Sequence, residues 1–154
     1  MLFWKKEHQI HSPMTGRLLP LEDVPDEVFA KGMMGKGIAI IPEEGGVAAP
    51  IDGKVSAIAP GLHAIGLTGE DGIEVLMHFG LETYKGHEGL FRYAVKLDDR
   101  VKKGDRLLDI DLDGFRDSVL YTPIVITNSD DYEITFEKTD KVAKGEILLK
   151  YRRK

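Results

Sequence analysis

Apolar residues along this chain alternate with polar residues over short runs, and Gly, Pro, Asp and Asn separate the runs. Alternation is typical of half-buried β-strands, and turns at spacings of roughly 8–12 residues are typical of an all-β sandwich or barrel. The predicted strands are 7–11, 16–21, 37–42, 47–49, 53–59, 63–68, 73–79, 90–95, 106–111, 123–127, 133–136 and 147–152. No window shows a helical period over three turns, so we expect an antiparallel all-β fold with two very short helices. One is predicted at 26–31, and the other at 113–120 with Asp113 as its N-cap.

Two pairs of segments repeat along the chain. SPMTGRL at 12–18 resembles APIDGKV at 49–55, and VKKGDRLLDI at 101–110 resembles VAKGEILLKY at 142–151. The repetition favours an internally duplicated, hairpin-rich architecture. Pro-x-x-Gly and Lys-Gly-Asp are also common turn sequences, so the resemblance alone leaves unrelated turns as an alternative.

The clearest hairpin lies at 62–79, where two alternating runs flank a Gly-Glu-Asp-Gly turn. If Glu70 and Asp71 form a two-residue loop, His63 lies directly opposite His78. Opposed side chains on one face have Cβ atoms about 4.5–5.5 Å apart. The hairpin therefore predicts two adjacent imidazoles on a mixed, accessible face.

An imidazole titrates near neutral pH and can act as a general base, a metal ligand or a phosphoryl acceptor. Two neutral imidazoles suit reversible phosphoryl transfer, because one nitrogen attacks phosphorus while the other ring donates a hydrogen bond to the equatorial oxygens. Two histidines alone form a weak zinc site, since catalytic zinc normally has three protein ligands. A chance pair of histidines remains the alternative from alternation alone.

Length and composition bound the remaining classes. The 154 residues fit a single domain at 1–154, with 1–8 expected as a flexible tail. The net charge of −5 argues against nucleic acid as a partner and suits a basic protein partner. The chain has no cysteine, so disulfides and cysteine nucleophiles are excluded. We find neither a signal peptide nor an apolar run long enough to span a membrane, and so expect a cytoplasmic protein without membrane insertion.

Several motifs together resemble a known family. VLMHFGLET at 75–83 follows APIDGKV and HAIGL and has the pattern of an aliphatic run, His-Phe-Gly and an aliphatic-acidic-Thr segment. Supporting stretches are EDVPDEVFA at 22–30, GKGIAI at 35–40, VKKGD at 101–105 and TPIVITN at 122–128. In this order they resemble the glucose-type IIA component of the bacterial sugar phosphotransferase system. The resemblance implies a duplicated β-sandwich.

The resemblance also implies a phosphocarrier function. His78 resembles the histidine that is phosphorylated on Nε2, and His63 resembles the second histidine, which hydrogen-bonds the phosphoryl group. Family members accept phosphate from the phosphohistidine of the carrier HPr and pass it to a cysteine of a IIB domain, and some bind regulatory targets. The resemblance implies a monomer that requires no cofactor, although zinc is bound in some members at a partner interface, here through His63 and His78.

A partner surface is implied around the histidines. The positions that match the family's apolar collar are Val28, Phe29, Met33, Met34, Leu76 and Tyr84. Asp26 and Glu82 match acidic positions at the edge of that collar, where they would steer a basic partner. Core packing is the alternative for the apolar residues, and plain solvation is the alternative for the two carboxylates.

One position departs from the family pattern. Family members usually have Thr two residues before the first histidine, and Gly61 occupies that position here. Two other classes of protein share a related β architecture. A biotinyl or lipoyl carrier domain needs a Lys at a hairpin tip, commonly within Met-Lys-Met, and the related zinc peptidases need His-x-His with a distant His-x-x-x-Asp. The sequence contains neither pattern.

Overall fold

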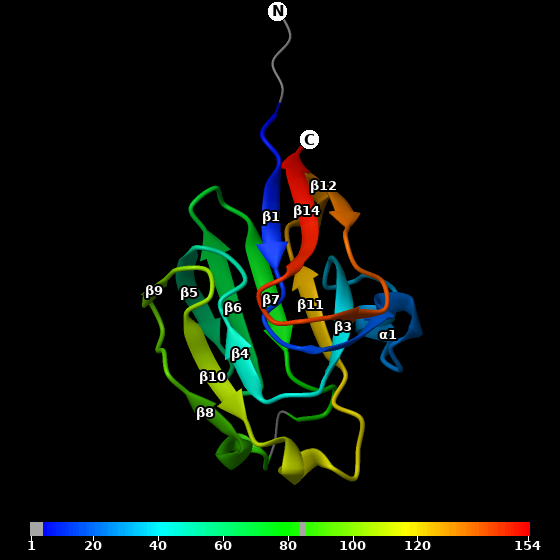
Figure 1. Ribbon diagram of the computed structural model, residues 1–154, viewed down its shortest axis with the longest axis vertical. Helices are drawn as coiled ribbons and strands as arrows, with labels where there is room; N and C mark the ends of the chain where they lie inside the picture. The colour runs from blue at the N-terminus through cyan, green and yellow to red at the C-terminus, as the bar shows by residue number, and fades with distance from the viewer. Residues whose placement is uncertain (1–4, 84–85) are drawn as a thin grey trace, which may run out of the picture.

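A computed structural model describes residues 5–83 and 86–154, which form three antiparallel sheets and a few short helical turns (Figure 1). The eight-stranded sheet has the order β13-β2-β3-β11-β7-β6-β5-β9. Its strands are β2 (Gly16–Pro20), β3 (Lys36–Pro42), β5 (Gly53–Ile58), β6 (Ala64–Gly69), β7 (Glu74–His78), β9 (Arg100–Val101), β11 (Thr122–Ile126) and β13 (Lys141–Val142). The small sheets are β1 (His8–His11), β14 (Ile147–Arg153) and β12 (Tyr132–Phe136), and β4 (Gly46–Ala48), β10 (Arg106–Ile110) and β8 (Phe91–Tyr93). The predicted antiparallel all-β fold is confirmed.

The helical elements are few and short. They are α1 (Glu27–Ala30) and the 3-10 turns η1 (Leu21–Asp23), η2 (Glu88–Leu90), η3 (Leu112–Phe115) and η4 (Ser129–Asp131). The turn predicted at 26–31 is confirmed as α1, with Asp26 as its N-cap. The helix predicted at 113–120 is wrong: only η3 forms there, and the side chain of its cap residue, Asp111, makes no capping hydrogen bond.

The alternation that predicted the strands places one face of the large sheet in the main core. In β7, Val75 and Met77 are at most 1% exposed, whereas Glu74 is exposed. Every predicted strand is present, but β9 and β13 were missed. Each of these has only two residues, too few for alternation to be recognised.

The repeated segments occupy equivalent places in two halves of the fold. Gly16 of β2 pairs with Val142 of β13, and Gly53 of β5 pairs with Val101 of β9 in the same way. The turns are equivalent too, since Gly145 N donates to the Ser12 carbonyl and Gly104 N to the Ala49 carbonyl, both at 2.9 Å. The halves also exchange hydrogen bonds, from His11 N to the Pro50 carbonyl and from Ala48 N to the Pro13 carbonyl. The duplication inferred from short motifs therefore holds at the level of strand pairing.

A second, smaller apolar cluster covers the other face of the large sheet. Its buried members are Leu21, Val24, Phe29, Ala39 and Val125, with Leu19, Met34, Leu76, Leu81 and Tyr121 packed against them. Val125 and Leu76 are register partners in β11 and β7, so the cluster extends over the centre of the sheet. The η1–α1 segment, residues 21–30, lies on this cluster at one side of the molecule (Figure 1). It therefore packs beside the end of β7, where His78 lies.

The N-terminal segment was only partly predicted. Within the predicted tail at 1–8, His8 belongs to β1 and pairs with Tyr151 of β14, and residues 1–4 lie outside the described ranges. No helix in the described ranges is both long and apolar enough to cross a bilayer.

Candidate functional site: two histidines at the open end of a hairpin

His63 and His78 lie together, as the hairpin predicted. Their ring centroids are 5.1 Å apart and their planes meet at 76°. His78 is the last residue of β7, and the next residue, Phe79, donates its backbone N–H to the His63 carbonyl at 2.7 Å. Both side chains are partly exposed. Two imidazoles thus share one accessible position at the open end of the β6–β7 hairpin.

The register that places them there differs from the predicted one. Ala64, not His63, is the partner of His78, and Thr68 pairs with Glu74 rather than Ile73. The loop has three residues instead of two, because Gly72 is left-handed (φ +92°) and donates its N–H to the Gly69 carbonyl at 3.0 Å. The expected direct opposition of the histidines is therefore wrong, although their proximity is right.

The backbone before β6 brings His63 back to His78. Leu62 has a left-handed φ of +66°, and β6 begins only at Ala64, so strand alternation does not extend to His63. The Tyr93 hydroxyl donates to the Leu62 carbonyl at 2.8 Å and lies 3.4 Å from the Ala64 carbonyl. Burial raises the pKa of Tyr93, so it remains a donor at neutral pH. Tyr93 carries no sequence signal that links it to His63, and sequence reasoning missed it.

A backbone carbonyl determines the tautomer of His78. Nδ1 of His78 lies 2.5 Å from the Gly80 carbonyl oxygen. Because a carbonyl only accepts, Nδ1 carries the proton and Nε2 presents its lone pair. Gly80 reaches this position with a left-handed φ of +85°. The Phe29 ring packs against His78 with centroids 5.1 Å apart.

Both histidines favour the neutral form. Burial lowers the pKa of His78, opposed by the hydrogen bond to Gly80 and by the charge of Asp26. Burial and then the neighbouring His78 lower the pKa of His63, while a backbone hydrogen bond to Gly61 and the charge of Glu88 act the other way. Gly61, where the family has Thr, thus contacts His63 through its backbone.

The predicted apolar collar divides into core and surface. Phe29 is buried at 6% exposure, and Met34 and Leu76 are half-buried in the second cluster. Val28 is 42% exposed and Met33 is 71% exposed. These two are the collar positions, among those the structure describes, that offer substantial apolar surface to a partner. Tyr84 lies outside the described residues.

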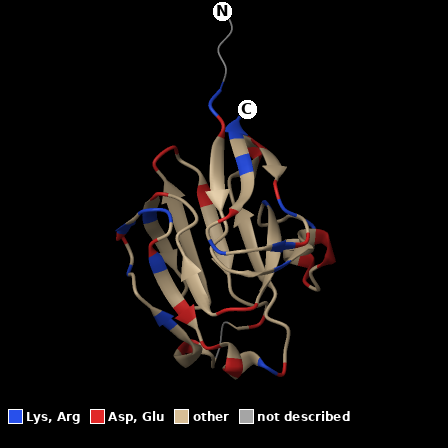
Figure 2. Cartoon of the chain, viewed as in Figure 1, with Lys and Arg blue, Asp and Glu red and all other residues tan. Residues whose placement is uncertain are grey.

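Acidic side chains gather beside this site. The η1–α1 segment carries Glu22, Asp23, Asp26 and Glu27 (Figure 2), and the Asp26 carboxylate caps α1 by accepting from Val28 N at 2.9 Å. Glu82 is exposed in the loop after Gly80. Asp26 and Glu82 also line a hollow of about 450 Å³ that reaches His87, whose ring stacks on Phe115. Asp26 and Glu82 thus lie at one hollow beside the histidines, and their role in steering a basic partner stays a prediction.

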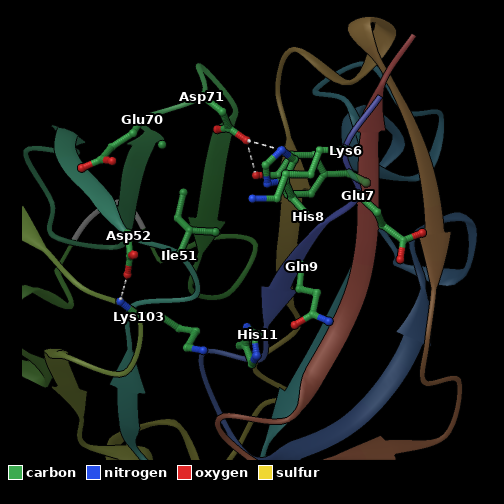
Figure 3. Close-up of a pocket in the computed structure, with 12 residues that line it drawn as sticks. Lys6, Glu7, His8, Gln9, His11, Ile51, Asp52, Glu70, Asp71 and Lys103 are labelled. Carbon is green, nitrogen blue, oxygen red and sulfur yellow. Dashed lines mark hydrogen bonds and ion pairs between the residues drawn. The ribbon is translucent and has the colours of Figure 1, made fainter. Parts of the chain in front are cut away.

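A larger cleft, of about 690 Å³, lies at the opposite end of the hairpin (Figure 3). There Asp71 at the hairpin tip accepts from the Tyr151 hydroxyl at 2.6 Å and lies 3.9 Å from Nε2 of His8. Asp52 accepts from the backbone N–H of Lys103 at 2.7 Å. The two Asp71 contacts tie the hairpin tip to the terminal strands β14 and β1, whereas the Asp52 contact joins the β4–β5 and β9–β10 connections. His8 and His11 are therefore strand residues of β1 and not tail histidines.

Two alternative classes receive no support from the site. The hairpin tip carries Glu70 and Asp71, where a biotinyl or lipoyl carrier would need Lys. Within residues 5–83 and 86–154, no group of three or more His, Asp or Glu side chains is arranged to hold a metal ion. The site instead has two adjacent imidazoles on an all-β scaffold, one of which has its Nε2 lone pair available.

Comparison with known proteins places this arrangement in a family. The model of the family "phosphoenolpyruvate-dependent sugar phosphotransferase system, EIIA 1" matches residues 8–132. The chain belongs to this family.

Similar proteins agree with this placement. The chain is 43% identical over 147 residues to the PTS system glucose-specific EIIA component of Staphylococcus epidermidis, covering 94% of this chain and 89% of that one. It is 48% identical over 142 residues, 91% of its length, to the PTS system glucoside-specific EIICBA component of Staphylococcus carnosus, but spans only 20% of that longer protein. The solved structure of glucose permease IIA from Mycoplasma capricolum superposes with a TM-score of 0.89 at 32% identity, covering 97% of this chain and 99% of that one.

Proposed function

We propose that this chain is a phosphocarrier of the sugar phosphotransferase system that carries the phosphoryl group on Nε2 of His78. Its family and fold support the phosphocarrier role. The observation that carries the assignment to His78 is the 2.5 Å contact between its Nδ1 and the Gly80 carbonyl. This contact reserves the Nε2 lone pair for attack on phosphorus.

The geometry suggests how each ring acts. The His78 Nε2 lone pair attacks the phosphorus of a donor phosphohistidine, and the donor's N–P bond breaks with its electron pair returning to the donor ring. The His63 ring, 5.1 Å away, would donate a hydrogen bond to an equatorial oxygen, where charge is spread in the transition state. In the second transfer a thiolate attacks the phosphorus, and the new P–N bond breaks in turn. The proton stays on Nδ1 of His78, hydrogen-bonded to the Gly80 carbonyl, throughout.

The partners follow from the same role. The donor would be HPr, and the acceptor would be the cysteine of a IIB domain. The EIICBA relatives join an A component to B and C components in one chain, which fits a IIB partner. The acidic η1–α1 segment and exposed Met33 would present a negative edge and an adaptable apolar surface to basic partners in turn. We place this exchange in the cytoplasm.

Zinc would need a partner at this site. His63 and His78 supply two of the three protein ligands that catalytic zinc usually has, so a bound ion would take at least one further ligand from another protein.

The function is tested by incubating the chain with phosphoenolpyruvate, Enzyme I and HPr. We expect phosphate that is acid-labile and base-stable, as a phosphohistidine is, and none in His78→Ala. His63→Gln is expected to accept phosphate but to pass it slowly to a IIB domain, because an amide that cannot titrate replaces the imidazole donor. His11→Gln, altered in the distant β1 strand, serves as the matched histidine control and should behave as wild type. No uptake by wild type, or equal uptake by His78→Ala, would overturn the proposal.

A further inference from the structure

Thr83 closes the loop that follows His78. Its side chain is buried, and its hydroxyl donates to the Phe79 carbonyl at 2.5 Å. Phe79 is in turn held at its N–H by the His63 carbonyl. The hydroxyl of Thr83 therefore connects the end of the loop to the residue between His78 and Gly80.

Thr83 also packs directly behind Gly80. A Cβ atom at Gly80 would lie 2.5 Å from Cγ2 of Thr83, 3.2 Å from its Oγ1 and 2.8 Å from Cδ1 of Leu120. Gly80 adopts φ +85°, a conformation that other residues rarely adopt. Thr83 and Leu120 thus occupy the space on one side of Gly80, the residue whose carbonyl accepts from His78.

We propose that Thr83 is a positioning residue for phosphoryl transfer. By bonding the Phe79 carbonyl and packing behind Gly80, it holds the Gly80 carbonyl against Nδ1–H of His78 and so keeps Nε2 as the acceptor. The role in transfer rests on the proposed function, whereas the effect on the His78 tautomer does not. Thr83 touches neither phosphate nor partner in this scheme.

Thr83 can have this effect because the other tautomer of His78 is readily accessible. A neutral histidine can carry its proton on either nitrogen, and the hydrogen bond that one nitrogen makes selects the tautomer. If the 79–83 loop relaxes, the Gly80 carbonyl withdraws and the tautomer with its proton on Nε2 gains population. That tautomer has no lone pair at the attacking atom.

The experiment compares substitutions at 83 that differ in one group. Thr83→Val keeps the shape and loses the hydroxyl, and Thr83→Ser keeps the hydroxyl and loses the methyl group. Ser12→Ala is the control, because the buried Ser12 hydroxyl also donates to a carbonyl, that of Met14 at 2.7 Å, away from His63 and His78. The readouts are the His78 tautomer from long-range ¹H–¹⁵N NMR and the single-turnover rate of phosphate acceptance from phosphorylated HPr.

We expect wild type, Thr83→Ser and Ser12→Ala to show the Nδ1–H tautomer. Thr83→Val should show a mixture and accept phosphate about tenfold more slowly, the scale of one modest hydrogen bond. If Thr83→Val fails to fold, Thr83→Ala is compared with Thr83→Ser, which differs from it by the hydroxyl alone. A wild-type tautomer and rate in the hydroxyl-free variant, or an equal change in Ser12→Ala, would overturn the proposal. Absence of phosphate uptake by wild type would defeat the proposed function but leave the tautomer comparison valid.

Discussion

At the scale of single residues, the environment of His78 favours a neutral imidazole. Burial lowers its pKa, and the Phe29 ring 5.1 Å away contributes to that burial. The Gly80 carbonyl and the charge of Asp26 favour the protonated form but do not outweigh burial. The pKa of His63 is also lowered, first by burial and then by the neighbouring His78. The lowered pKa values of His78 and His63 leave both rings neutral at pH 7.

This balance predicts the pH dependence of acceptance. In the proposed function the nucleophile is the neutral His78 ring, so the single-turnover rate from phosphorylated HPr should be constant around pH 7–8 and fall only below the ordinary histidine pKa of about 6.5. NMR titration should give His78 and His63 midpoints below that value. Because the unfolded chain takes up these protons at higher pH than the folded chain, the free energy of unfolding should also decrease as the pH drops through this range. Midpoints at or above 6.5 would contradict the argument.

At the scale of elements, α1 positions part of the site although it has only four residues. Such a helix has no stability of its own and depends on its cap and its packing. Asp26 accepts from Val28 N at 2.9 Å and from Phe29 N at 3.3 Å. Phe29, in the first turn, is buried against the large sheet and contacts His78. Capping and the packing of the His78 ring are therefore linked.

We predict that Asp26→Ala destabilises the protein by about 1 kcal/mol through loss of the cap. It should also lower the pKa of His78, because the charge of Asp26 raises it. Asp26→Asn separates the two effects, since Asn is a good N-cap without charge: stability should be near wild type while the pKa still falls. The measurements are denaturant unfolding and NMR titration. Equal stability loss in both variants would show that the cap is not what Asp26 contributes.

For the β6–β7 hairpin, the sequence predicted the strands and the proximity of the histidines but not the register. Alternation placed β6 and β7 within one residue of their observed ends and brought His63 close to His78. It chose the wrong register, because Gly-Glu-Asp-Gly suits both two- and three-residue loops and only the backbone at Gly72 decides between them. The Gly80 carbonyl orients the His78 ring, and the Leu62 carbonyl, which accepts from Tyr93, holds the backbone before His63. Every residue has a backbone carbonyl, so the side-chain pattern of the sequence cannot predict which carbonyls make these contacts.

At the scale of the whole molecule, the two halves have equivalent strand pairing, but the histidine pair lies in only one of them. The strand pairs β2–β13 and β5–β9 match in register, and each begins beside a turn with a left-handed glycine. The histidines lie on the hairpin that follows β5, and their surroundings include α1 and Tyr93 of β8, a strand that has β12 as its counterpart in the other three-stranded sheet. Short repeated motifs were sufficient to predict the duplicated strand arrangement, whereas the site depends on contacts between segments far apart in sequence.

The duplication also predicts that the equivalent turns at Gly104 and Gly145 respond alike to substitution. Gly104 and Gly145 have φ of +91° and +92°, and a Cβ atom at either position would meet nothing within 4 Å. Substitution by Ala therefore adds backbone strain without a clash, and each should cost about 1–2 kcal/mol. Because the turns are equivalent and separate, the two losses should be equal within about 0.5 kcal/mol and additive in the double variant. Gly89→Ala, which also meets open space but where no left-handed φ is required, is the control and should be near neutral. Urea unfolding measures all four variants, and a large difference between Gly104→Ala and Gly145→Ala would show that the halves are alike in pairing but not in energy.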